Sequence, residues 1–353
     1  MKFLTIKTKR VMKKIFIAMA ALACVVCSCS KVNAELNENE AQESVVYITL
    51  NDGTATRASG ADHGLQAQDN TLNSLDILIF NYDEEGENYG MLDGYKRYSK
   101  SDLTTTSSLS VKATTGKKMI YAIANSHKDN WEGVMTLSEF QEQVTDLLDE
   151  GAKDFIMIGG KEETLQLSTS VSIAIRRMVA RVQLNSVTAA FTGTPYEGTA
   201  LEDVKAYLIN VQGAKYIHNG EGDDMKLINS KRYVEADVQD AAMEGLLYDE
   251  LIASLPEGAY NTKHYFYCYE NNISEETDAK RYTRLVIEGK LNGTTYYYPV
   301  PIKQLKRNCC YVIDVKIQRP GSSDPDKDVE LGTFKVSLNV TGWETTYSNN
   351  VEF

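Results

Sequence analysis

The sequence predicts a protein built almost entirely from β-strands, arranged as two tandem antiparallel sandwiches. Strand-like runs with alternating apolar side chains follow one another from Val45 onward, short turn sequences separate most of them, and helical patterns are few. About a dozen strands are too many for one small sandwich. We therefore expect an N-terminal sandwich over residues 58–170 and a C-terminal sandwich over residues 171–353.

Length and composition agree with a chain that buries a substantial core. The 353 residues correspond to about two ordinary domains, and 42% of them are hydrophobic while 24% are charged. The chain has 37 Lys and Arg against 49 Asp and Glu, a formal net charge of −12. Because phosphate contacts need clustered basic side chains, this balance argues against nucleic acid as a partner.

Residues 1–28 have the pattern of a secretory lipoprotein signal. A basic segment is followed by the apolar run IFIAMAALACVVC. Cys29 is the expected lipidation site, because small Ser28 precedes it and aliphatic Val26 lies three residues before it. Cys24, preceded by Ala23, is the alternative. An ordinary signal peptidase site without lipid is also compatible with these residues. A lipid-modified cysteine would be a firm membrane anchor.

Residues 29–57 are expected to form a tether and a first strand. The tether is polar and acidic, and in the strand Val46, Ile48 and Leu50 alternate with more exposed positions. Asn51-Asp52-Gly53 ends the strand as a turn. The following segment, 54–71, reads as a loop that contains Arg57.

Further strands are expected along the rest of the chain. They cover residues 74–83, 107–113, 117–125, 155–160, 164–168, 172–187, 204–212, 263–271, 283–291, 294–302, 310–318 and 334–343. In the last of these, Phe334, Val336, Leu338 and Val340 form one apolar row. The preceding segment, 320–332, reads as an exposed loop that separates this strand from the others.

Two helices are predicted. Thr136 and Glu139 have the spacing of a capping box, and the apolar positions after them, Leu137 to Leu148, recur at helical spacing. A weaker pattern covers residues 236–251, where Gly245 interrupts it.

The sequence has no motif that indicates catalysis, a metal or a cofactor. A nucleophile elbow, a zinc-protease motif and a phosphate-binding loop are all absent. Cys268, Cys309 and Cys310 are expected to be buried apolar residues. We therefore expect a protein that is not an enzyme and needs no cofactor.

Several segments together resemble the fimbrillins, the subunits of type V pili in Bacteroides-type bacteria. They are the lipobox CSCSK, the Thr-Arg-Ala loop after the first strand, YAIAN at 121–125, RRMVARVQL at 176–184, AYLINV at 206–211 and KRNCCYVIDVKI at 306–317. The resemblance implies two transthyretin-like sandwich domains and a lipoprotein precursor. It also implies cleavage between Arg57 and Ala58 by a trypsin-like, Arg-specific protease. Arg57 as an ordinary loop residue is the alternative.

Physical reasoning connects this cleavage to assembly. A cut at Arg57 leaves the strand of Val46, Ile48 and Leu50 held by noncovalent pairing alone, and its departure would open a groove that recruits another strand. The natural donor is the segment 333–353 of a second copy or of a related pilin subunit. Donor and acceptor surfaces differ, so the contact generates a head-to-tail filament at the cell surface that supports adhesion. The alternatives are a tip or anchor subunit, or a monomeric surface lipoprotein that binds glycans or a host.

Overall fold

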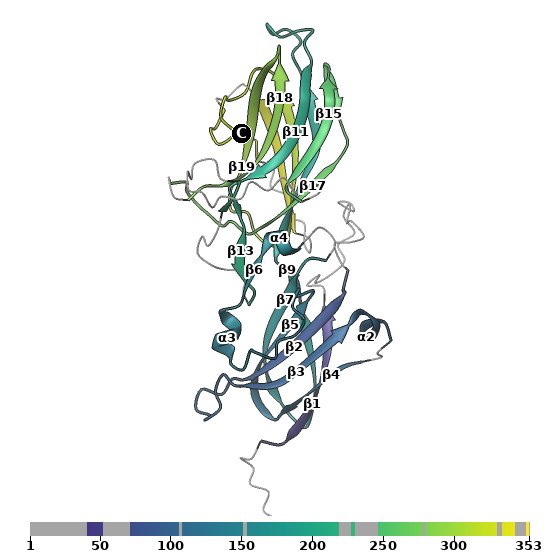
Figure 1. The fold of residues 1–353 in the computed structure, drawn as a ribbon, viewed down its shortest axis with the longest axis vertical. Helices are drawn as coiled ribbons and strands as arrows, with labels where there is room; N and C mark the ends of the chain where they lie inside the picture. Colours follow the sequence, from purple (N-terminus) through teal and green to yellow (C-terminus); the bar gives the residue numbers. More distant parts are fainter. Residues whose placement is uncertain are drawn as a thin grey trace, which may run out of the picture. The chain divides into compact units, whose positions relative to one another are not determined.

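The computed structural model describes residues 41–51, 71–105, 108–150, 154–218, 227–229, 246–277, 280–329, 334–342 and 351–352. These residues form mostly β-strands and only short helices (Figure 1). The predicted all-β class is therefore confirmed. None of the helices in these ranges is long and apolar enough to cross a membrane.

Two sheets in the first half of the chain enclose one hydrophobic core. Their strands are β1 (Glu43–Asn51), β2 (Ser74–Asn81), β3 (Leu92–Ser99), β4 (Leu109–Thr114), β5 (Gly116–Ala124), β7 (Met157–Leu165), β8 (Ser168–Ala174) and β9 (Arg176–Arg177). The smaller sheet has the order β4-β1-β8 and the larger the order β3-β2-β5-β7-β9. Inward-facing side chains of both sheets, among them Val46, Ile77 and Ile120, are buried together. This is the sandwich arrangement, in which alternate residues of each strand face the core. A short helix, α2 (Lys100–Thr105), follows β3.

The second half contains two further large sheets. Their strands are β10 (Val179–Ala189), β11 (Leu201–Ile209), β15 (Tyr248–Leu255), β16 (Gly258–Tyr260), β17 (His264–Tyr269), β18 (Thr283–Leu291), β19 (Thr294–Ile302), β20 (Cys309–Ile317), β21 (Phe334–Gly342) and β22 (Val351–Glu352). One sheet runs β16-β10-β20-β21-β22, with β17 also paired to β10, and the other runs β15-β11-β18-β19. The apolar faces of these sheets share a second core cluster, which includes Leu208, Ile287 and Ile313.

A short strand pair and an aromatic contact join these two groups of sheets. β6 (Val144–Asp146) of the first half pairs with β13 (Ala214–Tyr216) of the second half. A further short pair, β12 (Val211–Gln212) with β14 (Leu227–Ile228), lies within the second half. The rings of Phe155 and Tyr267 lie 4.5 Å apart. The division expected near residue 170 falls inside β8, which belongs to the first group of sheets. The division into two domains itself stays a prediction.

The predicted helix over residues 137–148 is wrong beyond Gln141. α3 (Leu137–Gln141) begins with the predicted capping box: Thr136 Oγ1 accepts from the Glu139 N–H, and the Glu139 carboxylate accepts from the Thr136 N–H. The chain then extends as β6 before a second short helix, α4 (Leu147–Glu150). Val144 and Thr145 are β-branched, which favours the extended state, and pairing with β13 decides it.

Three other expectations also differ from the structure. The weak helix over 236–251 lies partly outside the described residues, and its end, Tyr248–Leu251, is part of strand β15. The single strand over 172–187 is three strands, β8, β9 and β10. The two strands expected at 155–160 and 164–168 are one strand, β7. Its middle residues alternate between exposed and half-buried positions, and the exposed polar ones face water on the outer side of the sheet.

Two glycines bring the sheets of the first half into close contact. A Cβ on Gly94 of β3 would lie 2.5 Å from the Lys112 carbonyl oxygen of β4, and a Cβ on Gly159 of β7 would lie 2.0 Å from the Ala174 carbonyl oxygen of β8. β4 and β8 are the two strands that flank β1. The absence of a side chain at both positions therefore sets the distance of these flanking strands from the facing sheet.

We expect Gly94→Ala and Gly159→Ala each to destabilise the protein by about 1–3 kcal/mol, because the added methyl group must push backbone aside. The measurement is the midpoint of denaturant unfolding. Gly133→Ala is the matched control, because nothing lies within 4 Å of its added Cβ. Its effect should stay within about 0.5 kcal/mol. Equal effects for the three variants would contradict this account of the close contacts.

Candidate strand-exchange site

Strand β1 lies in the middle of its sheet, between two neighbours. It runs antiparallel to β4 (Figure 1), from Glu43 opposite Thr114 to Ile48 opposite Leu109. It runs parallel to β8, from Val45 opposite Ser168 to Asn51 opposite Ala174. The sequence predicted that departure of β1 would open a groove, but it did not identify the two strands that line it. The structure pairs β1 on both edges, and β8 was missed because it lies more than a hundred residues along the chain.

The inward face of β1 is part of the core. Val46 and Ile48 are buried, at 0% and 5% exposure, and Leu50 is half-buried against the same cluster. Ser44 is also buried, and its hydroxyl donates to the Gln166 carbonyl oxygen at 2.5 Å. Tyr47, on the opposite face, is 41% exposed. Loss of this strand would therefore expose apolar pockets along one side and unpaired backbone groups along two.

Polar contacts fix the start of β1. Gln42 and Thr115 exchange two hydrogen bonds, from Gln42 N to Thr115 Oγ1 at 3.0 Å and from Thr115 N to the Gln42 carbonyl oxygen at 2.8 Å. Lys112 lies 2.6 Å from the Glu43 carboxylate, and its hydrogen bond lowers the pKa of that carboxyl. Both side chains of this pair are exposed, so water screens it and it adds little stability. The strand is held mainly by its backbone pairing and its buried face.

The predicted cleavage and lipidation residues cannot be placed. Arg57, Ala58, Cys29 and Cys24 lie outside the described residues. The described chain leaves β1 at Asn51 and resumes at Thr71, just before β2.

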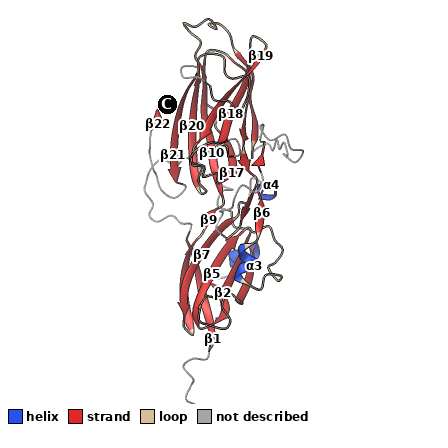
Figure 2. Cartoon of the chain, turned by 90° about the vertical axis from the view of Figure 1, so that its left-hand side faces the viewer, coloured by secondary structure: helices blue, strands red, loops and turns tan. Residues whose placement is uncertain are grey.

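The predicted donor segment forms a strand in its own chain. β21 pairs antiparallel with β20 over its whole length, from Phe334 opposite Ile317 to Gly342 opposite Cys309 (Figure 2). On its other side it pairs with the short β22 at Ser337 and Leu338. Leu338 is buried, Val336 is half-buried against the core, and Val340 pairs through its backbone with Tyr311. This arrangement is the one expected for a subunit whose two terminal strands both remain in place.

The loop before β21 is anchored at Asp326, so the expectation of an exposed loop over 320–332 is wrong at this residue, while residues 330–332 lie outside the described ones. Asp326 is buried and accepts from the guanidinium groups of Arg281 and Arg284, each at 3.2–3.3 Å, and from Asn210 Nδ2 at 2.8 Å. Ser322 pairs with Tyr297 through both of its backbone groups.

A second acid strengthens this anchor. Glu276 lies 2.5 Å from Arg284, which has 0% exposure. Burial alone would raise the pKa of Glu276, but hydrogen bonds and nearby charges, first the hydrogen bond from Arg284, lower it below its usual value. Asp328, more exposed, also accepts from Arg284 at 3.0 Å. The loop is therefore tied down as far as Asp328, and any movement of β21 must begin after that residue.

The chain resembles known proteins in sequence and in fold. Residues 44–175, which contain β1 and both of its neighbours, match the family described as the major fimbrial subunit protein (FimA). This match, a fimbrium subunit relative and a fimbrilin of similar fold support the assignment of the chain to the fimbrillin family. The resemblance expected from the sequence is thus confirmed.

Relatives and solved structures agree with this assignment. The "Putative fimbrium tip subunit Fim1C" of Parabacteroides distasonis is 24% identical over 313 residues, which cover 82% of this chain and 77% of that protein. The crystal structure of a fimbrilin (FimA) from Porphyromonas gingivalis has a TM-score of 0.63 at 17% identity, with 86% and 99% of the two chains covered. The tip fimbrial protein Mfa3 of Porphyromonas gingivalis has a TM-score of 0.50 at 13% identity and covers 86% and 100%. At these identities the two structures show the fold alone.

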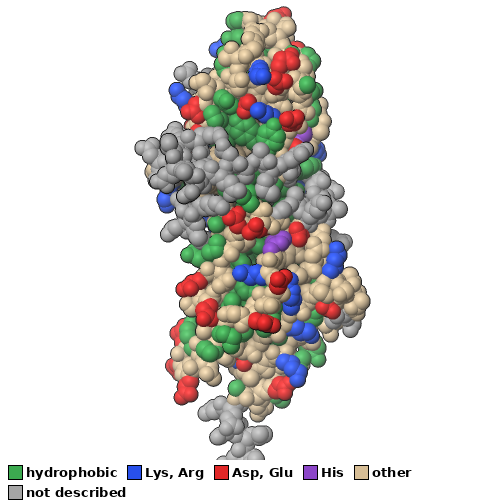
Figure 3. All heavy atoms as spheres, viewed as in Figure 1, with side chains coloured by type: hydrophobic (Ala, Val, Ile, Leu, Met, Phe, Trp, Pro, Cys, Tyr) green, Lys and Arg blue, Asp and Glu red, His purple; other side chains and the backbone are tan. Residues whose placement is uncertain are grey.

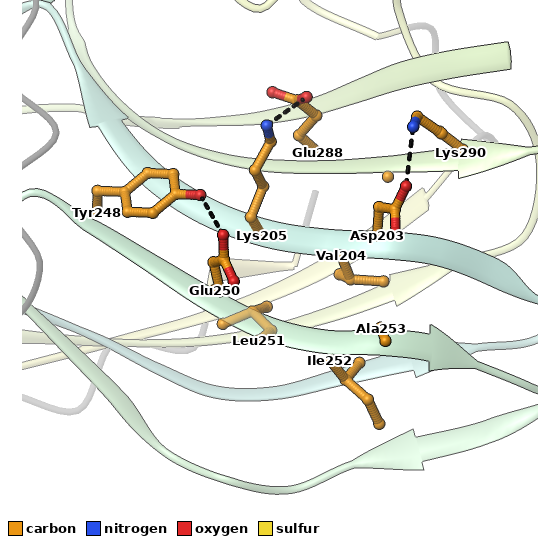
Figure 4. A pocket seen from close by; sticks show the side chains of 11 residues that line it. Asp203, Val204, Lys205, Tyr248, Glu250, Leu251, Ile252, Ala253, Glu288 and Lys290 are labelled. Atoms are coloured by element: carbon orange, nitrogen blue, oxygen red, sulfur yellow. Dashed lines mark hydrogen bonds and ion pairs between the residues drawn. The ribbon is translucent and has the colours of Figure 1, made fainter.

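A polar groove lies on the sheet β15-β11-β18-β19 of this fimbrillin (Figure 4). Its charged groups pair with one another across the strands: Lys205 with Glu288 at 3.0 Å, and Lys290 with Asp203 at 2.8 Å. Tyr207 donates to Glu288 at 2.9 Å, and the burial of Tyr207 is the main cause of its raised pKa. Paired charges on the solvated side of an antiparallel sheet are a common surface feature.

On the face seen in Figure 3, acidic and basic side chains are interspersed rather than gathered into a basic patch.

One acid, one histidine and one hydroxyl form a chain that resembles part of a catalytic site. His264 Nδ1 lies 2.6 Å from Asp249 Oδ2, and His264 Nε2 lies 2.8 Å from the Tyr260 hydroxyl. The same hydroxyl donates to the Leu251 carbonyl oxygen at 3.0 Å. Its proton is therefore held by backbone, and the arrangement connects β15, β16 and β17 rather than presenting a nucleophile. Within the described ranges, no group of three acidic, His or Cys side chains could hold a metal ion.

Among the described residues, none of the three body cysteines forms a disulfide. Cys268 and Cys310 are buried, as expected, whereas Cys309 is half-exposed. Burial raises the pKa of the Cys268 thiol far above its usual value, which keeps it protonated and unreactive.

Asp326→Asn should destabilise this fimbrillin by about 3–5 kcal/mol, because it leaves two buried arginines facing an amide in place of a carboxylate. The measurement is the free energy of unfolding in denaturant. Glu43→Gln is the control, because it removes an exposed partner of Lys112, and it should change the free energy of unfolding far less than Asp326→Asn does. An Asp326→Asn variant as stable as Glu43→Gln would show that the loop is not anchored in the way described.

Proposed function

We propose that this fimbrillin is a structural subunit of a cell-surface fimbria that polymerises by strand exchange after proteolytic maturation. Its membership in the fimbrillin family supports the coarser part, a surface fimbrial subunit. The observation that carries the finer part is the position of β1. It is the strand nearest the expected cleavage site, it fills a central slot, and it is connected to the rest of the chain through the segment that contains Arg57.

The proposed sequence of events begins at the membrane. The chain is exported with residues 1–28 as its signal, and a lipid on Cys29, or on Cys24, holds the precursor at the outer membrane. An Arg-specific protease then cuts between Arg57 and Ala58. Before the cut, β1 is tethered and cannot leave; after it, β1 belongs to a separate peptide. The lipid stays on that peptide, so the body of the subunit can move away from it, and rebinding then becomes rare.

Chemical similarity of the two strands supports the exchange. β1 places Val46, Ile48 and Leu50 at alternate positions toward the core, and β21 carries Phe334, Val336, Leu338 and Val340 with the same period. Each such side chain contributes about 1.5–3 kcal/mol when buried. A donor from a second copy therefore replaces the lost burial, and two rows of backbone hydrogen bonds form with β4 and β8.

The contact is heterologous, which explains a filament rather than a closed dimer. The donor segment and the slot are different surfaces of one chain, so each subunit can give one strand and accept another. Partners are further copies of this chain or related pilin subunits.

A second candidate is a tip subunit, and a specific observation favours it: the relative Fim1C is described as a tip subunit. A tip subunit accepts a strand but need not donate one. The two candidates therefore share the slot and differ in the use of β21. A monomeric surface lipoprotein that binds glycans or a host would use neither.

We expect protein sheared from the cell surface to begin at Ala58, as read by N-terminal sequencing, and to form ladders that resist SDS. Arg57→Ala should leave the precursor uncut and abolish the ladders. Arg57→Lys is the matched control, because it keeps the charge but removes the side chain that an Arg-specific protease requires, so it should behave as Arg57→Ala does. Full assembly of either variant would rule out maturation at this bond.

A further inference from the structure

A lysine amine is buried among strands of the first sandwich and is not used by strand exchange. Lys118 of β5 is only 1% exposed. Its Nζ lies 2.8 Å from Asp93 Oδ2, 2.8 Å from Thr114 Oγ1 and 2.5 Å from Asn81 Oδ1. Buried lysines are uncommon, since burial penalises the charged amine. This one is placed directly against a carboxamide and a carboxylate.

The strand register brings the amine and the amide together. Asn81 of β2 and Lys118 of β5 are directly opposite each other. The next pair along the strands is hydrogen-bonded, from Tyr82 N to the Lys117 carbonyl oxygen at 2.9 Å. Asn81 and Lys118 therefore form a non-hydrogen-bonded pair, the kind whose side chains approach most closely.

The carboxylate is held where it can move protons. Asp93 begins β3 with Leu92 and accepts from the Thr114 N–H at 2.7 Å and from the Thr114 hydroxyl at 2.9 Å. These bonds fix its second oxygen against Lys118 Nζ. The Asp93 side chain is 12% exposed and that of Lys118 is 2% exposed. Both groups are therefore largely shielded from water and lie in direct contact.

The amide nitrogen of Asn81 is positioned to leave. Its only described contact, with the Met91 carbonyl oxygen, is long, at 3.4 Å. Asn81 itself is half-buried, whereas Lys118 is enclosed. The amine thus approaches the amide from the core side, and ammonia can reach water from the outer side.

We propose that Lys118 and Asn81 form an intramolecular isopeptide bond, with Asp93 as the proton-transfer residue. The neutral Lys118 amine attacks Asn81 Cγ, and the new C–N bond replaces the bond between Cγ and Nδ2. Asp93 accepts the proton from Lys118 and delivers one to the departing nitrogen, which leaves as ammonia. No oxidant, reductant or other reactant is needed, because an amine and a primary amide become a secondary amide and ammonia.

The reaction needs to occur only once in the lifetime of each molecule. Fixed proximity of two reacting groups corresponds to effective concentrations of roughly 10⁵–10⁸ M in well-oriented cases. Slow chemistry therefore suffices in a long-lived surface protein. The bond would tie β2 to β5, the two central strands of the sheet that faces β1, and so would hold that sheet together when β1 leaves. This inference concerns the chain itself and does not rest on strand exchange.

The test is a proteolytic peptide map with mass spectrometry on the full chain as purified. We expect a branched peptide that joins the segment containing Asn81 to the segment containing Lys118, lighter by one ammonia than the sum of the two. Recovery of the two segments as separate, unmodified peptides would overturn the proposal. That outcome corresponds to an ordinary ammonium held by three acceptors.

Variants separate this bond from other losses of ammonia. Asn81→Asp keeps a carbonyl at the same position, so the branched peptide should form with loss of water instead of ammonia. Asp93→Asn should leave the two segments separate, and so should Lys118→Arg. Lys117→Ala is the matched control, because Lys117 is exposed and pairs with Glu162, and it should leave the branched peptide unchanged. The unmodified chain decides the matter alone if a variant fails to fold.

Discussion

Pairing of β1 on both of its edges is the constraint on which the proposed function depends. A strand at the rim of a sheet can leave and expose one row of backbone groups. β1 leaves a slot with an antiparallel wall, β4, and a parallel wall, β8, and both walls then lack partners. Unpaired strand edges recruit other strands. A slot with two such walls and an apolar floor would accept only an extended segment with alternating apolar residues. Such an acceptor would bind a strand both strongly and selectively.

In the proposed exchange, the acceptor and the donor are restrained in different ways. The slot is occupied by a strand of the same chain, and the proposed cut after Arg57 would release that strand. The loop before the donor is anchored by Asp326 and Glu276, which hold Arg281 and Arg284 in a buried network that reaches Asp328. Breaking such a network by removing one partner is costly. The exchange would therefore leave this anchor intact.

Sequence patterns predicted those parts of the fold that local rules determine. The alternation of Val46, Ile48 and Leu50 marked the inward face of β1, and Thr136 with Glu139 marked the start of a helix. Strand β3 was missed because Gly94, Lys96 and Arg97 interrupt its apolar alternation. Gly94 is needed where β4 passes close to it, and Arg97 lies 2.8 Å from the buried Asp76. Both features depend on neighbours that are distant in sequence.

The two strands of the candidate site were predicted, but their surroundings were not. β1 and β21 were both expected as strands, yet the parallel pairing of β1 with β8 and the anchor at Asp326 were not, and the use of β21 as a donor stays a prediction. A parallel partner distant in sequence and a buried arginine pair leave no periodic signal, because periodicity reports only which face of an element is apolar. The helix prediction failed beyond Gln141 for the same reason, because pairing of β6 with β13 overrides the helical pattern.

Disulfide trapping in assembled fibres tests the central claim most directly. Ser170 is an exposed residue of β8 beside the slot, and Ser337 is an exposed residue of β21 that pairs with Asp314 in its own chain. Molecules carrying Ser170→Cys, mixed with molecules carrying Ser337→Cys or Asn339→Cys, should give crosslinked dimers in fibres but not in uncut precursor. The pair Ser337→Cys with Asp314→Cys should crosslink within the precursor and lose that crosslink on assembly. Fibres that retain the Ser337–Asp314 crosslink and never join β21 of one molecule to β8 of another would contradict strand exchange.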